Sequence, residues 1–182
     1  MDSAQAYGYM LYFVSLMTMG GIYAIMCLGL NIQWGFTGLF NAGIAGFFAI
    51  GAYVTAILTT AESTSHLGGY DLPVVFGLIS AMVVTAVIAW LVGLLCIRLR
   101  SDYLAIATIG IGEIFRLILK NEIWATNGAR GIAKIPLPFE SLSEPWNKIG
   151  FMMLVLVIVA VFYLSLIHIS EPTRPRLRSY AV

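Results

Sequence analysis

Charge is scarce in this sequence. Charged residues make up only 10% of its 182 residues, whereas hydrophobic residues make up 60%. Soluble globular domains carry about 25% charged residues, and a soluble fold of this size could not cover its surface with so few of them. The composition therefore excludes an ordinary soluble domain and predicts an integral membrane protein.

Residues that bind metals or carry out catalysis are equally few. The two cysteines, Cys27 and Cys96, lie inside apolar runs and do not have the spacing of metal ligands. Neither His66 nor His168 has a Cys, Asp or His partner at ligand spacing, and no histidine lies in an expected membrane span to activate a serine. The body of the chain also has no basic patch for nucleic acid. The sequence thus predicts no catalytic residues, no metal site, no cofactor and no nucleic-acid partner.

Long uncharged runs define the expected membrane spans. No Asp, Glu, Lys or Arg occurs among residues 3–61, and one spanning helix needs about 20 apolar residues, so this run is long enough for two crossings. We place the break between them at residues 31–38, which gather polar groups, a tryptophan and two glycines. The spacing of charges along the whole chain predicts an all-α, polytopic bundle of about five membrane helices. Their expected ranges are 7–30, 39–60, 72–97, 103–119 and 149–166.

Two further segments are polar. Residues 120–148 are expected to form an ordered loop outside the membrane with a short helix. After Leu164 the apolar pattern stops, and two prolines and three arginines follow. This tail is either a basic anchor beside the membrane or not native, because it resembles translated sequencing-adapter read-through, and we favour the second interpretation. We therefore expect residues 1–166 to be the N-terminal part of a transmembrane permease domain that continues further, and residues 167–182 to be a non-native or disordered tail.

Glycine is concentrated at the start of the second expected span. The segment reads GFTGLFNAGIAGFFAIGAY, and irregular backbone at membrane depth survives only against protein or a water-filled cavity. One interpretation is that Asn31, Gln33, Thr37 and Asn41 line a pathway there. The other is that the glycines serve helix packing and the polar residues form an interfacial turn. The residues alone do not separate the two.

The third expected span carries a small residue at every fourth position. In lipid, such a stripe indicates a tight helix–helix contact, since van der Waals packing drives helix association there. The members of this small-residue stripe are Gly77, Ala81, Thr85, Ala89 and Gly93.

Glu113 and Arg116 are the only charged residues inside the fourth expected span. Because they are three residues apart on a helix, they share a face and can form an ion pair. Ionisable groups within a membrane are costly and often functional. The pair therefore serves either structure alone, or gating or assembly.

Three blocks of the sequence, in order, resemble one known family. They read LGLNIQWGFTGLFNAGIAGFFAIGAY, CIRLRSDYLAIATIGIGEIFRLILKNE and TNGARGI. They resemble the membrane permease subunits of ABC importers for branched-chain amino acids, in particular the LivM-type subunit, over about residues 20–138. The chain departs from this family at Ile44, where many relatives have histidine, and at residues 127–132, where relatives have a Gly-Pro-Asn-Gly-Ile-like turn. The family also places a cytoplasmic coupling helix after the fifth span, where this chain has the tail described above.

The resemblance implies a multi-pass protein of the bacterial plasma (inner) membrane with no enzymatic activity of its own. It also implies alternating access. A periplasmic or extracellular substrate-binding protein delivers leucine, isoleucine or valine, the chain forms the path with a homologous permease, and two ATP-binding subunits drive the switch. Carried onto this sequence, the resemblance places the path, or the shape of the helix that lines it, at Asn31, Gly35, Thr37, Gly38, Asn41, Gly43 and Gly46.

Two other functions remain open. Permeases for urea or short amides are similar in sequence, so the resemblance is more specific for the family than for the substrate. A channel, or a membrane scaffold that transports nothing, also fits an apolar bundle of closely packed helices.

Overall fold

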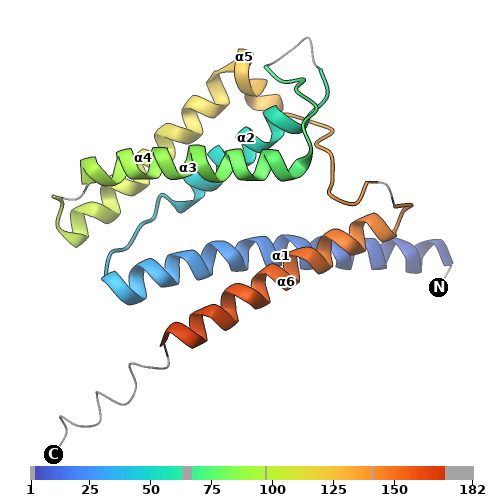
Figure 1. The fold of residues 1–182 in the computed structure, drawn as a ribbon, viewed down its shortest axis with the longest axis horizontal. Helices are drawn as coiled ribbons and strands as arrows, with labels where there is room; N and C mark the ends of the chain where they lie inside the picture. The colour runs from blue at the N-terminus through green and yellow to red at the C-terminus, as the bar shows by residue number, and fades with distance from the viewer. Residues whose placement is uncertain (1–2, 63–66, 97, 141, 171–182) are drawn as a thin grey trace, which may run out of the picture. The chain divides into compact units, whose positions relative to one another are not determined.

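The computed structural model describes residues 3–62, 67–96, 98–140 and 142–170, and the fold is drawn in Figure 1. Within these ranges every regular element is a helix, and none of the described residues forms a strand. The expected all-α fold is therefore confirmed. Of the expected tail at 167–182, residues 171–182 lie outside the described residues, while residues 167–170 continue the last helix.

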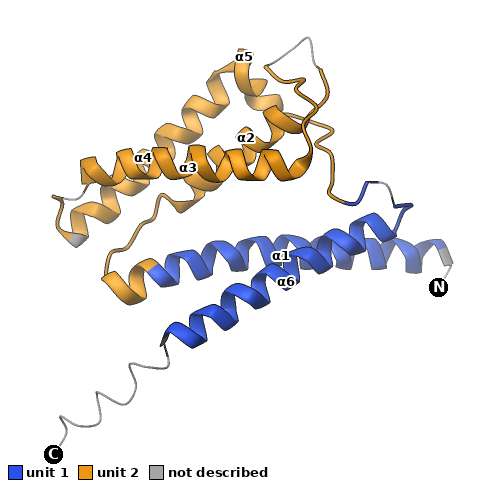
Figure 2. Cartoon of the chain, viewed as in Figure 1, with its two compact units in different colours: residues 1–32, 139–182 blue, residues 33–138 orange. Residues whose placement is uncertain are grey.

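The chain divides into two compact units (Figure 2). Unit 1 combines residues 1–32 with residues 139–182, and unit 2 consists of residues 33–138. The division falls inside helix α1, Ser3–Thr37, whose last turn belongs to unit 2.

Unit 1 consists of two long apolar helices, α1 and α6. Helix α6 spans Trp146–Ser170. The two helices approach closely at Gly21, where a Cβ atom would lie 2.6 Å from Cγ1 of Val155. Val14 of α1 and Val155 of α6 are only 6% and 5% exposed. The missing side chain of Gly21 leaves space for Val155 of α6. Small residues at such contacts let membrane helices approach closely.

Unit 2 is built around a short central helix, α2, Ile44–Thr59, which packs against both α3, Val74–Cys96, and α4, Ser101–Asn121 (Figure 1). A short helix, α5, Ile123–Thr126, and a 3₁₀ turn, η1, Gly128–Arg130, follow α4 within the expected polar loop. Ile50, Ala56 and Thr59 of α2 are buried. Because α2 contacts both longer helices of this unit, it positions the residues of the cavity that is described in the next subsection.

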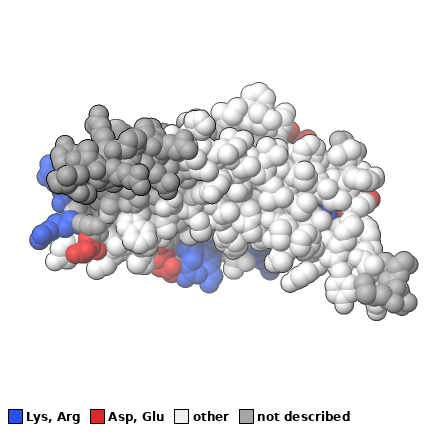
Figure 3. Space-filling view, turned by 90° about the horizontal axis from the view of Figure 1, so that it is seen from below, with Lys and Arg blue, Asp and Glu red and all other residues white. Residues whose placement is uncertain are grey.

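Three of the described helices are long and apolar enough to cross a membrane: Ala4–Thr37, Val74–Cys96 and Trp146–Ile169. Helix α2 is apolar but has only 16 residues, and α4 carries four charged residues among its 21. Figure 3 shows one face of the molecule, where Lys, Arg, Asp and Glu occupy a few small areas of the described surface. The structure thus supports a multi-pass membrane protein, and the crossings expected for α2 and α4 stay predictions.

The break expected at residues 31–38 is shorter in the structure and begins later. Helix α1 continues through this segment to Thr37, so the expected end at Leu30 is wrong. The segment contains no proline, and its polar side chains leave the helical hydrogen bonds intact. The helix stops at Gly38, whose φ of +68° is the left-handed conformation that commonly ends helices, and whose N–H donates to the carbonyl of Trp34 at 3.0 Å.

The second expected helix also begins later, at Ile44 instead of Leu39. Residues 38–43 leave the helical conformation, and three of their backbone N–H groups donate to side-chain oxygens. Leu39 donates to Thr37 at 3.3 Å, Ala42 to Thr108 at 3.1 Å, and Gly43 to Asn41 at 3.0 Å. Such bonds offer the backbone an alternative to the helix, which apolar periodicity alone does not reveal.

Candidate functional site

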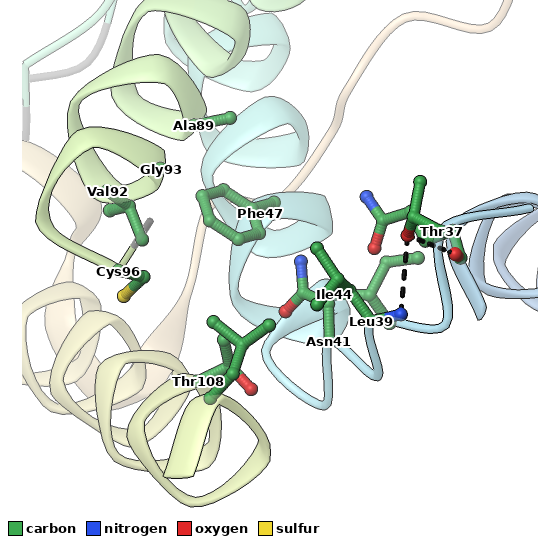
Figure 4. A pocket seen from close by; sticks show the side chains of 12 residues that line it. Thr37, Leu39, Asn41, Ile44, Phe47, Ala89, Val92, Gly93, Cys96 and Thr108 are labelled. Carbon is green, nitrogen blue, oxygen red and sulfur yellow. Dashed lines mark hydrogen bonds between the residues drawn. The ribbon is translucent and has the colours of Figure 1, made fainter. Parts of the chain in front are cut away.

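Unit 2 contains a cavity of about 460 Å³, drawn in Figure 4. This volume falls within the range of about 300–1,000 Å³ that is typical of small-molecule sites. Its walls come from the end of α1, the connection to α2, and helices α2, α3 and α4. The lining residues are Gln33, Thr37, Leu39, Asn41, Ile44, Phe47, Ala89, Val92, Gly93, Cys96, Leu104 and Thr108.

One end of the contact between α2 and α3 is closed. A Cβ atom on Gly77 would lie 2.5 Å from Cγ2 of Thr59, and one on Gly51 would lie 3.3 Å from Oγ1 of Thr85. Gly77 and Ala81 are buried. The first half of the small-residue stripe therefore packs against α2, as a stripe of this kind predicts.

The other end of the same contact is open. The pairing of Gly77 with Thr59 and of Gly51 with Thr85 sets an antiparallel register, and that register places Ala89 opposite Phe47. Figure 4 shows the Ala89 side chain pointing from α3 toward α2, near Phe47. Ala89 and Gly93 line the cavity and are exposed. Ala89 and Gly93, the second half of the stripe, thus border the cavity, whereas the first half packs against α2.

A second close contact, between α2 and α4, depends on glycine. A Cβ atom on Gly43 would lie 2.6 Å from the backbone carbonyl oxygen of Thr108, and one on Gly46 would lie 3.0 Å from Cα of Gly112. The rings of Phe47 and Phe115 meet edge to face at 5.7 Å. Gly43 and Gly46, which were expected at the path or its shape, serve this helix contact beside the cavity.

Hydrogen bonds fix the polar side of the cavity. Thr108 is buried, and its hydroxyl accepts from Ala42 N–H and donates to the Ala105 carbonyl at 3.0 Å. The hydroxyl of Thr37 donates to the Gln33 carbonyl at 2.5 Å. The Oδ1 atom of Asn41 accepts from Gly43 N–H. These oxygens hold the connection between α1 and α2 in place.

Two side-chain amides of this cavity have NH₂ groups that can donate hydrogen bonds to a ligand. The side-chain amides of Gln33 and Asn41 both line the cavity. No hydrogen bond between described residues uses the NH₂ group of either side chain. Each of these groups has two N–H donors. The cavity therefore pairs an apolar wall on α3 with amide donors on the opposite side.

The expected path residues fall into four groups. Thr37 and Asn41 line the cavity, as does Gln33, and Gly43 and Gly46 pack against α4. Gly38 ends α1. Asn31 and Gly35 are exposed on α1 and are not among the residues lining this cavity.

Several cavity residues were not singled out from the sequence for this role. Ala89 and Gly93 were assigned to packing, and Leu104, Thr108 and Cys96 were assigned no role. Gly112 in the fourth expected span was a usable signal for the close approach of α4 to the glycine-rich segment, because its Cβ position lies 3.3 Å from Cα of Gly43. Cys96 is buried at the cavity wall, and Cys27 is exposed on α1.

Glu113 and Arg116 form the expected ion pair. Arg116 Nε donates to Glu113 Oε2 at 2.8 Å, and Arg116 Nη2 to Oε1 at 2.5 Å. The two side chains are 62% and 51% exposed for Arg116 and Glu113. Neither residue lines the cavity, and α4 meets α2 through other residues, such as Gly112 and Phe115. The pair is therefore separate from the cavity.

We expect the substitution Arg116→Gln to lower the amount of folded protein in the membrane. It would leave the Glu113 carboxylate without its partner in a helix expected to cross lipid, where an isolated charge is costly. The double variant Glu113→Gln/Arg116→Gln should recover much of the loss, since removing both charges is better tolerated than removing one. The measurement is the amount of folded protein extracted from membranes. Lys120→Gln, on the same helix, is the control, and an equal loss in that variant would contradict the role of the pair.

Among the described residues, no group of three or more His, Cys, Asp or Glu side chains could hold a metal ion. His168 lies on α6, and His66 lies outside the described residues.

The comparisons with known proteins identify the family. The profile of a family described as "Branched-chain amino acid transport system / permease component" matches residues 12–170. The chain belongs to this family. The branched-chain amino acid permease protein LivM of Salmonella typhimurium is 43% identical over 125 residues, and LivM of Escherichia coli K12 is 42% identical over the same length. Each alignment covers 69% of this chain and 28% of the relative.

A second type of branched-chain amino acid permease protein is also similar. The permease protein LivH of Salmonella typhimurium is 28% identical over 129 residues, which cover 68% of this chain and 41% of LivH. The chain thus spans less than half the length of these curated relatives. No solved structure matches it.

Proposed function

We propose that this chain is part of the permease subunit of an ABC importer for leucine, isoleucine and valine. It forms the translocation path together with a homologous permease, receives substrate from a periplasmic or extracellular binding protein, and is driven by two separate ATP-binding subunits in the bacterial plasma membrane. It hydrolyses no ATP itself. Membership in the family and the similarity to LivM over 69% of the chain support this proposal.

The observation that carries the proposal is the two-sided chemistry of the cavity. Ala89, Val92 and Gly93 of α3 line one side, Asn41 lies on the other (Figure 4), and Gln33 is also among the lining residues. None of the lining residues is charged. An amino acid with a branched apolar side chain and a carboxylate matches both sides, because the apolar wall accepts the side chain and the amide N–H groups donate to the carboxylate.

A transport assay tests the substrate. In cells that depend on this permease, we expect uptake of labelled leucine that unlabelled isoleucine and valine reduce by competition and urea does not. The control is the same strain with the permease gene deleted. Uptake of urea that leucine leaves unchanged would instead support a permease for urea or short amides.

A second assay tests the energy source. We expect the intact permease to co-purify with two ATP-binding subunits, and leucine uptake to stop when ATP is depleted. Conductance that persists without these subunits would overturn the proposal in favour of a channel.

A further inference from the structure

We infer that Gly93 and Ala89 of α3 set the size of the aliphatic group that the cavity admits, an inference that rests on the proposed function. The two residues lie four positions apart and belong to the same stripe as Gly77. Their position in the cavity gives them a different role from the packed members of that stripe.

The space around Gly77 and Gly93 distinguishes helix packing from lining the cavity. A Cβ atom on Gly77 would lie 2.5 Å from Thr59, so a larger residue there would have to displace α2. A Cβ atom on Gly93 would meet nothing within 4 Å. A side chain added at Gly93 would therefore extend into free volume without moving the helices.

That free volume belongs to the cavity. Gly93 lines it together with Ala89, Val92 and Cys96, and Figure 4 shows these α3 residues on the side away from Thr37 and Asn41. A ligand whose carboxylate binds the amides of Gln33 and Asn41 therefore directs its side chain toward Ala89 and Gly93. The absence of large side chains at these two positions leaves room for a branched group.

Steric fit of this kind changes selectivity. One methylene group in an apolar pocket discriminates between substrates by about 10- to 200-fold. Filling the α3 side should therefore exclude leucine and isoleucine before it excludes valine or alanine. A change that only damaged the fold would reduce the uptake of all four amino acids equally.

The test is a graded series at Gly93 in the intact permease with its partner subunits. Gly93→Ala, Gly93→Val and Gly93→Leu add side chains of increasing size, and Ala89→Leu fills the same side from the neighbouring turn. We measure uptake and KM for leucine, isoleucine, valine and alanine. We expect the ratio of leucine to alanine uptake to fall at each step, by at least about 10-fold for Gly93→Leu, with the change mainly in the KM for leucine.

Gly110→Leu is the matched control. Gly110 also has open space around its Cβ position, lies inside a helix, and does not line the cavity. This variant should keep the wild-type ratio. An unchanged ratio in Gly93→Leu and Ala89→Leu would overturn the inference while leaving the proposed function intact. Failure of the wild-type permease to take up any of the four amino acids would overturn both.

Discussion

The substitution Gly43→Val should sharply reduce the stability of the permease. A Cβ atom at this position would lie 2.6 Å from the carbonyl oxygen of Thr108. The added side chain therefore meets the backbone of α4 and not a flexible side-chain end. Overpacking of this kind costs about 1–3 kcal/mol and occasionally more, so we expect a lower melting temperature in detergent and less folded protein in membranes.

The cause is purely steric. Gly43 has φ −80° and ψ 5°, a conformation open to other residues. The backbone of α4 has little freedom to retreat, because Thr108 is buried and its hydroxyl is bonded to both Ala42 and Ala105. Gly110→Val is the control, since that glycine has open space. Equal melting temperatures of the Gly43 and Gly110 variants would show that α2 and α4 do not meet at Gly43.

The substitution Asn41→Asp should lower leucine uptake by about 10- to 100-fold. This is the loss in affinity expected when a hydrogen bond to a charged group is removed. Aspartate keeps the oxygen that accepts from Gly43 N–H, so the start of α2 remains held. It replaces the amide N–H donors with a second carboxylate oxygen. The new negative charge would then repel the carboxylate of the substrate.

Separate measurements distinguish this effect from a loss of folding. The amount of Asn41→Asp protein in membranes and its melting temperature are measured first, and the KM for leucine is expected to rise in the folded protein that remains. Asn121→Asp, at the exposed end of α4 and outside the cavity, makes the same chemical change as a control. Wild-type uptake by the Asn41→Asp permease would remove Asn41 from substrate binding.

The helices could be predicted from the sequence where charge bounds them. The expected ranges 72–97 and 103–119 differ from α3 and α4 by two residues or fewer at each end. Pro73 precedes α3, and Arg98 and Arg100 separate α3 from α4, so the apolar pattern itself sets the positions of these helix ends. The end of α1 was missed because polar residues are compatible with a helix, and only the left-handed Gly38 stops it.

The cavity could be predicted only in part. Thr37 and Asn41 stood out as polar groups in an apolar run, and they do line it. The other walls come from α3 and α4, which are distant in sequence from Asn41. Whether Gly43 or Gly93 faces a neighbouring helix or free space depends on where those helices cross. Spacing along one helix cannot supply that information, so Gly77 and Gly93 look alike in the stripe and differ in the structure.

The brevity of α2 has a consequence for the lipid around it. Sixteen residues of helix measure about 24 Å, less than the roughly 30 Å hydrocarbon thickness of a bilayer. In the predicted crossing of α2, residues 38–43 would make up the shortfall, because side-chain oxygens of Thr37, Asn41 and Thr108 accept three of their backbone N–H groups. A solute that entered beside residues 38–43 would then cross less hydrocarbon than one that moved along a full-length spanning helix.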